Sequence, residues 1–487
     1  MKLTFRTLLL LLCGVMLASA VACTGGTDEL VSTDAEPTDP AEDTTEPSSE
    51  EPTTEEVTTE EVTTEEPDVM IGETLDAAYA ADFTVSKVFT SDMVVQRGEK
   101  LRVWGWAPES ENGKKISGEF MGMFAEALIE NGAWTLQFLA KLPANAELGN
   151  TMKIYTDTKT VEFENVLVGD VYMVIGQSNV AYTFQNYLYA SNTDTKNYGA
   201  NMMDENLPIR LHYNTLNEGE AQGYPKRGTT EVCEDVVHNR TWEKPGPAAV
   251  NRFTAVGYCF AWNLVQMTDG KVPVGIIEID GNGQPLGSFL PNEVADALGS
   301  DTLQNGIYVP EGVNATWARY MYNHYMYPFE KYAMAGVVWY QGESDSELNM
   351  APRYRDLFEM MVSDWRSKWE SDDLPFITVQ LANCRVSDIE SFALVRECQL
   401  MAVDTIPDVG MVTIGDIGDV DDIHPKDKKT LGERLALYAR GMIYGEDVTY
   451  RPPVCREASF DGEKVTLKFS DAGEGLYETE KHKFFAV

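Results

Sequence analysis

From residue 167 onward, short runs of largely apolar, β-prone residues alternate with stretches that place apolar residues at helical spacing. The apolar runs cover residues 171–175, 272–279, 335–340, 376–381 and 409–414. The helical stretches include residues 355–368 and 391–403. Buried strands interleaved with helices favour an α/β fold around a parallel sheet, and such sheets hold their active sites at the carboxyl ends of the strands. The sequence therefore predicts a site in the loops that follow these runs.

The residues on either side of this region differ from it. Residues 83–166 contain short β segments separated by Gly and Asn-Gly turns, which predicts a small antiparallel β-sandwich domain over residues 71–166. No titratable cluster stands out there, so we expect a supporting role for this domain. Residues 446–487 return to β character and form a C-terminal β segment. The predicted catalytic domain is then residues 167–445.

Residues 1–22 have the features of an export signal: Lys2 and Arg6, then a Leu-rich apolar stretch, then small residues before a cleavage site. Cys23 follows a small residue, which resembles the signal of bacterial lipoproteins, in which the cysteine is lipidated and becomes the mature N-terminus. This resemblance implies a cell-surface protein that is attached to the membrane by a lipid. Secretion after cleavage behind Ala20 is the alternative. The apolar stretch is too short to favour a transmembrane helix.

Residues 23–70 are rich in Glu, Thr and Pro, and residues 24–68 contain 17 acidic residues and no basic one. Such a segment buries too little apolar surface to offset its chain entropy, so it is predicted to be a disordered tether. The formal net charge of the chain is −40, and the acidity extends beyond this segment. A negative field of this size argues against a nucleic-acid partner. The seven cysteines show no CxxC spacing, which indicates neither a disulfide framework nor a zinc site.

Ser178 is the first candidate for a catalytic residue. Residues 171–179 read Val-Tyr-Met-Val-Ile-Gly-Gln-Ser-Asn, and a helix is expected over residues 180–188. A serine at a strand-to-helix turn has an exposed hydroxyl, and N–H groups of the helix start point at whatever it attacks. This geometry suits acyl transfer. Serines are common after strands, however, so the chain must also supply a base, an acid that orients it and an oxyanion hole.

His424 is the candidate base, because a hydroxyl needs a base within hydrogen-bond reach. It lies in Asp-Val-Asp-Asp-Ile-His-Pro-Lys, after the last predicted strand and before a helical run, with Asp421 three residues before it and Asp422 two before it. A carboxylate beside Nδ1–H would fix the tautomer and leave Nε2 to take the serine proton. Pro425 keeps His424 itself out of a helix. The other four histidines lack distinctive acidic neighbours.

Two further loops at predicted strand ends offer donors for an oxyanion. Residues 280–285 read Asp-Gly-Asn-Gly-Gln-Pro, and their glycines allow close backbone approach. Residues 339–345 read Trp-Tyr-Gln-Gly-Glu-Ser-Asp and offer a side-chain amide. An ordinary glycine turn remains the alternative interpretation of each loop.

Gly-Gln-Ser-Asn, Trp-Tyr-Gln-Gly-Glu-Ser and Asp-Ile-His-Pro, in this order, resemble the SGNH (GDSL-like) hydrolase superfamily, in particular its sialate O-acetylesterase branch. The resemblance extends over about residues 85–470. It implies a three-layer α/β/α domain with Ser178 as the nucleophile and His424 as the base. It also implies an oxyanion hole formed by the N–H groups of Ser178 and Gly283 and by the amide of Gln341.

The resemblance leaves two points open. The superfamily places its aspartate three residues before the histidine, whereas this branch often places it two before; we expect Asp421 rather than Asp422 to be the acid. The second block usually reads Gly-Gly-Thr, whereas this chain has Asn282-Gly283-Gln284.

These features predict a bacterial carbohydrate O-acetylesterase whose substrate is an acetylated sugar, either sialic acid or a plant polysaccharide. The reaction would pass through an acetyl-serine and would need no metal or organic cofactor. Trp339 and Tyr340 could stack on a sugar ring, although a place in the core is favoured. The altered second block motivates an alternative, a catalytically inactive sugar-binding surface lipoprotein on the same scaffold.

Overall fold

A parallel β-sheet forms the centre of the computed structural model, which describes residues 80–190, 201–214, 230–237, 240–298, 319–347, 350–385, 389–473 and 475. Six strands lie in the order β10–β11–β9–β12–β13–β14, β2 pairs with β9 outside this path, and every pairing is parallel. The strands are β2 (Val94–Gln96), β9 (Leu167–Gly176), β10 (Ile209–Tyr213), β11 (Val274–Asp280), β12 (Gly336–Tyr340), β13 (Phe376–Val379) and β14 (Val409–Val412). The prediction that five apolar runs form neighbouring parallel strands is confirmed.

Two strands of this sheet, β2 and β10, were not among the predicted apolar runs, and β10 is the longer one. Its sequence, Ile-Arg-Leu-His-Tyr, places two polar residues in a short run, yet Arg210 and His212 are both buried. The Arg210 guanidinium donates to the carbonyls of Leu207 and Ile209, at 3.1 and 2.7 Å. The His212 ring packs against Trp242 and Phe329. The apolar pattern did not predict this strand because these two polar residues interrupt it, although both are buried.

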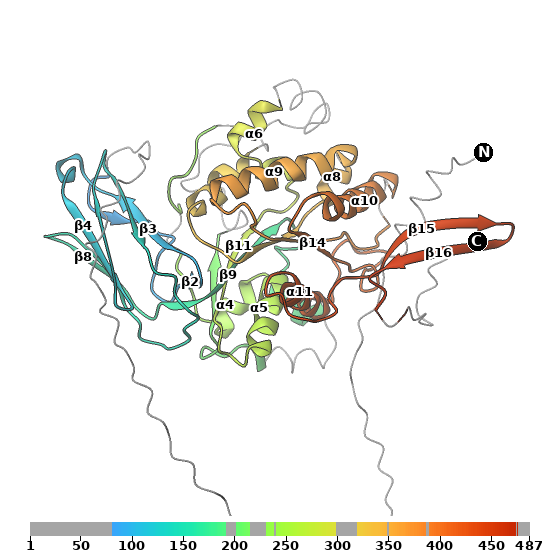
Figure 1. Cartoon of the computed structure of the whole chain (residues 1–487), viewed down its shortest axis with the longest axis horizontal. Helices are drawn as coiled ribbons and strands as arrows, with labels where there is room; N and C mark the ends of the chain where they lie inside the picture. Colours follow the sequence, from blue (N-terminus) through green and yellow to red (C-terminus); the bar gives the residue numbers. More distant parts are fainter. Residues whose placement is uncertain are drawn as a thin grey trace, which may run out of the picture. The chain divides into compact units, whose positions relative to one another are not determined.

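Helices cover both faces of the sheet. Helices α9 and α10 lie on one face and α5 and α11 on the other (Figure 1). These four helices are α5 (Ala255–Met267), α9 (Tyr354–Lys368), α10 (Ile389–Thr405) and α11 (Lys428–Met442). Helices α5 and α11 approach closely, because a Cβ added at Gly432 would lie 2.5 Å from the Cβ of Cys259. Together these layers make a mixed α/β fold around the parallel sheet.

Two antiparallel sheets are formed by strands within residues 84–163, a range that also contains β2 of the parallel sheet. One has the order β1–β3–β6 and the other β5–β4–β7–β8. Their strands are β1 (Thr84–Val85), β3 (Leu101–Trp106), β4 (Lys115–Phe120), β5 (Met123–Leu128), β6 (Ala133–Phe138), β7 (Met152–Tyr155) and β8 (Thr160–Phe163). The sheets face one another, because a Cβ at Gly118 of β4 would lie 2.8 Å from the Phe138 ring of β6. The supporting role of these residues stays a prediction.

The remaining elements are short. They are α2 (Phe184–Ala190), α4 (Pro247–Arg252), α6 (Asn292–Ala297), α8 (Glu343–Glu347), the single-turn helices η1 (Glu109–Glu111), η3 (Leu286–Phe289), η5 (Tyr322–Met326), η6 (Tyr327–Phe329) and η7 (Ala351–Arg353), and the antiparallel hairpin β15 (Val454–Asp461) and β16 (Lys464–Ser470). No helix within the described ranges has the length and apolar character needed to cross a membrane. The predicted signal, Cys23 and the acidic tether lie outside the described residues.

Candidate active site

The nucleophile turn follows the carboxyl end of β9, in the middle of the sheet. Gly176, the last residue of β9, is in register with Asp280 of β11 and Tyr340 of β12. A side chain could not replace the hydrogen at Gly176, because its Cβ would lie 2.0 Å from the carbonyl oxygen of Tyr340. Beyond it, the N–H of Val180 closes a turn on the carbonyl of Gln177, at 2.9 Å, and this turn contains Ser178.

The helix predicted to begin at residue 180 begins later, because α2 starts at Phe184. Residues 177–181 form a hydrogen-bonded turn instead, in which the N–H groups of Val180 and Ala181 both bond to the carbonyl of Gln177. These two N–H groups are therefore engaged in the turn and cannot serve as helix-start donors. The expectation that a helix start directly follows Ser178 is corrected.

His424 reaches Ser178 from the loop between β14 and α11. Its Nε2 lies 2.9 Å from the Oγ of Ser178, across 246 positions of sequence. Helix α11 begins directly after this loop and is capped by Asp427, whose carboxylate accepts the N–H of Thr430 at 3.0 Å. The structure therefore brings the predicted nucleophile and the predicted base into hydrogen-bond contact.

Asp422, not Asp421, is the carboxylate beside the imidazole. Its Oδ1 lies 3.4 Å from Nδ1 of His424 and accepts the backbone N–H of His424 at 2.9 Å. The Asp421 side chain is 77% exposed and points to Arg385, whose guanidinium lies 3.3 Å away. The expectation that Asp421 orients His424 is therefore corrected. The physical reason is the tight turn that Asp422 makes with the His424 N–H, which brings this carboxylate to the ring and turns its neighbour to solvent.

The ionisation of the pair favours a neutral base and a charged acid. Burial lowers the pKa of His424 below 6.5; the positive charge of Lys428 lowers it further, and Asp422 opposes both effects. The hydrogen bond from the His424 N–H is the main cause that lowers the pKa of Asp422. At neutral pH the imidazole is therefore free to accept a proton, and the aspartate is charged.

The residues on either side of Ser178 hold its turn in place. The Oε1 of Gln177 accepts from the N–H of Ser344 at 3.3 Å. The Nδ2 of Asn179 donates to Glu343 at 2.6 Å and to the carbonyl of Ile423 at 3.1 Å. Gln177 and Asn179 are both buried, whereas Ser178 between them is partly exposed. The turn is thus anchored on both sides of the one side chain that solvent and a substrate can reach.

The two loops predicted to bind an oxyanion differ in exposure, because Gly283 is exposed and Gln341 is buried. Gly283 is exposed, adopts a positive φ of 68° and has nothing within 4 Å of an added Cβ. Gln341 is fully buried next to the nucleophile turn, 3.3 Å from Gln177 Oε1. Its amide nitrogen also donates to Asp345 and, at 3.1 Å, to the carbonyl of Gln284. The oxyanion roles of Ser178, Gly283 and Gln341 stay predictions, and that of Gln341 would require its amide to exchange a partner.

Charged residues buried around the site are a feature that the sequence did not reveal. Glu343 and Asp345 follow β12 in the Gln-Gly-Glu-Ser-Asp loop, and Lys428 begins α11. All three are buried, and burial raises the pKa of each carboxyl to about 7 and lowers that of Lys428 to about 7. Glu and Asp directly after an apolar strand were visible in the sequence. Their burial was not, because it depends on the packing of α8 and α11.

The aromatic residues after β12 belong to the core. Trp339 and Tyr340 are fully buried, and the indole N–H of Trp339 donates to the hydroxyl of Tyr354 at 3.0 Å. The favoured interpretation of both residues as core is confirmed. The aromatic ring beside the base is instead Tyr182, stacked on His424 with 6.4 Å between ring centroids.

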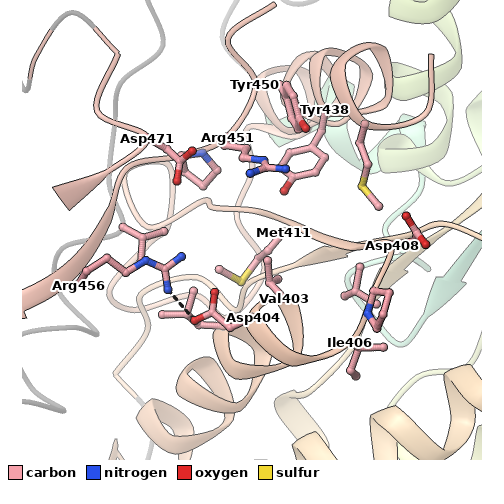
Figure 2. A pocket seen from close by; sticks show the side chains of 16 residues that line it. Val403, Asp404, Ile406, Asp408, Met411, Tyr438, Tyr450, Arg451, Arg456 and Asp471 are labelled. Carbon is pink, nitrogen blue, oxygen red and sulfur yellow. Dashed lines mark hydrogen bonds and ion pairs between the residues drawn. The ribbon is translucent and has the colours of Figure 1, made fainter. Parts of the chain in front are cut away.

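A cavity of about 270 Å³ is lined by residues of α10, β14, α11 and β15 and of the segments next to them (Figure 2). Its lining includes Pro407 and Asp408, which precede β14, so it lies at the amino end of that strand, whereas Ser178 follows the carboxyl end of β9. Arg456 and Asp404 at its rim form an ion pair of 2.6 Å with each other. The cavity is therefore not part of the Ser178 site.

In the described part of the chain, no cluster of three His, Cys, Asp or Glu side chains is arranged to hold a metal ion.

A serine hydroxyl in contact with a histidine that an aspartate supports, at the carboxyl edge of a parallel sheet, has the geometry of an α/β serine hydrolase. The family model described as carbohydrate esterase, sialic acid-specific acetylesterase matches residues 168–440, more than half of the chain. The chain belongs to this family. The predicted resemblance to sialate O-acetylesterases is confirmed.

Individual relatives agree with this assignment. The sialate O-acetylesterase of Homo sapiens is 24% identical over 352 residues, which cover 67% of this chain and 64% of the human protein. That of Rattus norvegicus is 23% identical over 382 residues, covering 68% and 67%. The chain thus spans slightly less than two thirds of the length of the human relative. Among solved structures, a carbohydrate acetylesterase from Xanthomonas citri superposes with a TM-score of 0.67 at 29% identity, covering 80% of this chain and 81% of that one.

Proposed function

We propose that this protein is a carbohydrate O-acetylesterase that works through an acetyl-serine intermediate. The observation that carries the proposal is the 2.9 Å contact between Ser178 Oγ and His424 Nε2, with Asp422 on the other side of the ring. Membership of the carbohydrate esterase family and the likeness to the Xanthomonas citri acetylesterase support the acetylated sugar as substrate.

The proposed reaction uses two side chains, those of Ser178 and His424, and two backbone N–H groups. Ser178 Oγ attacks the acetyl carbonyl carbon while His424 Nε2 takes the hydroxyl proton. Backbone N–H groups of Ser178 and Gly283 are the proposed donors to the oxyanion. The tetrahedral intermediate breaks its bond to the sugar oxygen, and His424 returns the proton to that oxygen. His424 then deprotonates a water that attacks the acetyl-serine, and acetate leaves as Ser178 regains its proton.

We also propose how the domains around this site are arranged and how the protein is attached to the cell. The α/β layers would form an SGNH hydrolase domain, and the two antiparallel sheets before it would be a sandwich that supports it. A signal peptide, lipidation at Cys23 and the acidic tether would place the domain on the outer surface of a bacterial cell. A radiolabelled palmitate assay on wild type and Cys23→Ala would test the anchor.

The sugar is the first property to measure. We expect purified protein to release acetate from at least one of three substrates: O-acetylated sialic acid, acetylated xylan and acetylated mannan. The readout is enzymatically quantified acetate, with Ser178→Ala as the blank. Preference for the sialic acid would assign the substrate that the family description names, and preference for a polysaccharide would assign a plant-cell-wall role. Release from none of them would contradict the proposal.

A sugar-binding protein without turnover is the second candidate. The observations that favour it are the engaged amide of Gln341 and the change to Asn282-Gly283-Gln284 in the second block. This candidate predicts that wild type binds an acetylated sugar and hydrolyses 4-nitrophenyl acetate no faster than Ser178→Ala. The esterase proposal predicts the opposite for hydrolysis.

The pH profile gives a further test. Because burial and Lys428 lower the pKa of His424, the imidazole stays neutral to a lower pH than a free histidine, whose pKa is 6.5. We expect kcat/KM for 4-nitrophenyl acetate to fall on acidification with a midpoint below pH 6.5. A midpoint above that value would contradict the lowered pKa. A profile that stays flat to about pH 4 would contradict the role of His424 as base.

A further inference from the structure

A lysine is buried beside the turn that contains Ser178. Lys428, the first residue of α11, is 0% exposed. Its ammonium donates to the Oδ1 of Asn179 at 2.7 Å and lies 5.2 Å from the ring centroid of Tyr182 and 5.3 Å from that of Tyr340. Burial of a cation is costly unless its charge is compensated. Here an amide oxygen and two aromatic faces surround the charge, and the carboxylate of Glu343 lies beyond the amide.

The Asn179 amide links four parts of the site. Its oxygen accepts from Lys428, and its nitrogen donates to Glu343 and to the carbonyl of Ile423. Asn179 is bonded to Ser178 in the chain, and Ile423 is bonded to His424. The hydrogen bond between Asn179 and Ile423 therefore ties the nucleophile turn to the loop that carries the base.

We infer that Lys428 and Asn179 are positioning residues that hold the Ser178 turn and the His424 loop together for catalysis. The inference rests on the proposed esterase function. An amide can face its surroundings in two ways, which differ by a half-turn about its last bond. An ammonium can only donate and the carbonyl of Ile423 can only accept, so the amide oxygen faces Lys428 and the amide nitrogen faces Ile423 and Glu343. The ammonium thus fixes the orientation that lets the amide reach the His424 loop.

Lys428 has a second effect, on the imidazole itself. Its positive charge lowers the pKa of His424, and Asp422 acts in the opposite direction. The groups that face Lys428 are Glu343 from α8, Asp422 from the His424 loop and Cys259 from α5. The pKa of Lys428 is about 7, so the amine carries its charge in the acidic range in which His424 titrates. Loss of that charge should therefore raise the pKa of His424.

Lys428→Met tests both effects, because it keeps the length of the side chain and removes the charge. We expect kcat for 4-nitrophenyl acetate to fall about 10- to 100-fold, the range that a small misplacement of reacting groups can cost. KM should change less than about threefold, because Lys428 and Asn179 are both buried and do not contact the substrate. The acid midpoint of kcat/KM should move to higher pH. Lys428→Arg, which keeps the charge, should restore the wild-type midpoint.

The matched control is Lys429→Met, the next residue of the same helix, whose side chain is 40% exposed and pairs with Glu433. It should leave kcat and the midpoint unchanged. Circular dichroism melts show which variants are folded. If Lys428→Met does not fold, Asn179→Asp replaces it: it keeps the acceptor for Lys428 and loses the amide donor to the carbonyl of Ile423, so kcat should fall at least about tenfold with little change in KM.

A fluorophosphonate probe separates this inference from the choice of substrate, because its labelling of Ser178 needs the serine and histidine but no sugar. Slower labelling in folded Lys428→Met than in Lys429→Met supports positioning, even if no acetylated sugar is hydrolysed and the proposed function fails. Equal labelling rates, or kcat within threefold of wild type with an unmoved acid midpoint, would overturn it.

Discussion

Ser178→Ala is expected to reduce hydrolysis of 4-nitrophenyl acetate and of the preferred acetylated sugar by about 10⁴-fold or more, because loss of a serine nucleophile removes the covalent route entirely. The hydroxyl lies 2.9 Å from His424 in a turn that is anchored through its neighbours Gln177 and Asn179. The substitution removes one oxygen from a partly exposed position and leaves those anchors intact. Stability should therefore change little.

Initial rates, thermal melts and fluorophosphonate labelling together check this result. A folded Ser178→Ala protein with more than about a hundredth of wild-type activity would mean that another residue is the nucleophile. Ser344 is the control, since it is a serine that contacts the Ser178 turn, and its N–H rather than its hydroxyl bonds to Gln177. Ser344→Ala should keep the labelling of Ser178.

Asp422→Asn is expected to lower kcat by about 10²- to 10⁴-fold, whereas Asp421→Asn should stay within about threefold of wild type. An amide at position 422 can present its NH2 group to Nδ1, which favours the tautomer that cannot take the serine proton at Nε2. The Asp422→Asn substitution also removes the negative charge that stabilises the imidazolium. The pH at which kcat/KM falls to half on acidification should therefore move lower. Asp421 faces Arg385 and solvent, so the Asp421→Asn substitution should have neither effect.

The two aspartates are a matched pair because they are adjacent, chemically identical and both at the surface. Michaelis parameters and pH profiles of both variants decide between them. A severe loss in Asp421→Asn with a mild one in Asp422→Asn would restore the assignment made from sequence, and would mean that the loop rearranges when substrate binds.

The contact between Ser178 and His424 could be predicted because strand ends in a parallel sheet share one edge. The apolar runs that became β9 and β14 were recognisable; Ser178 lies in the turn after β9, and His424 lies in the loop between β14 and α11. The acid could not be assigned in the same way. Asp421 and Asp422 differ by one position in a loop, and the hydrogen bond from the His424 N–H to Asp422 decides which carboxylate faces the ring.

The burial of Lys428 next to Asn179 and Glu343 could not be predicted from the sequence, for a related reason. A lysine at the start of a helix is normally solvated, and nothing local to Lys428 distinguishes it from Lys429 beside it. Only the packing of α11 against the nucleophile turn buries one and exposes the other. Strand β10 was not predicted because Arg210 and His212 interrupt its apolar run, and the packing that buries them is not visible in the sequence.

The 246 positions between Ser178 and His424 have a consequence for how activity arises during biosynthesis. A ribosome that has completed β9 has made the alcohol, but the imidazole that activates it is still untranslated. Truncated products that end before the His424 loop carry a nucleophile without a base. The proposed hydrolytic site can therefore form only after the ribosome has passed His424 and β14 has joined the sheet that contains β9.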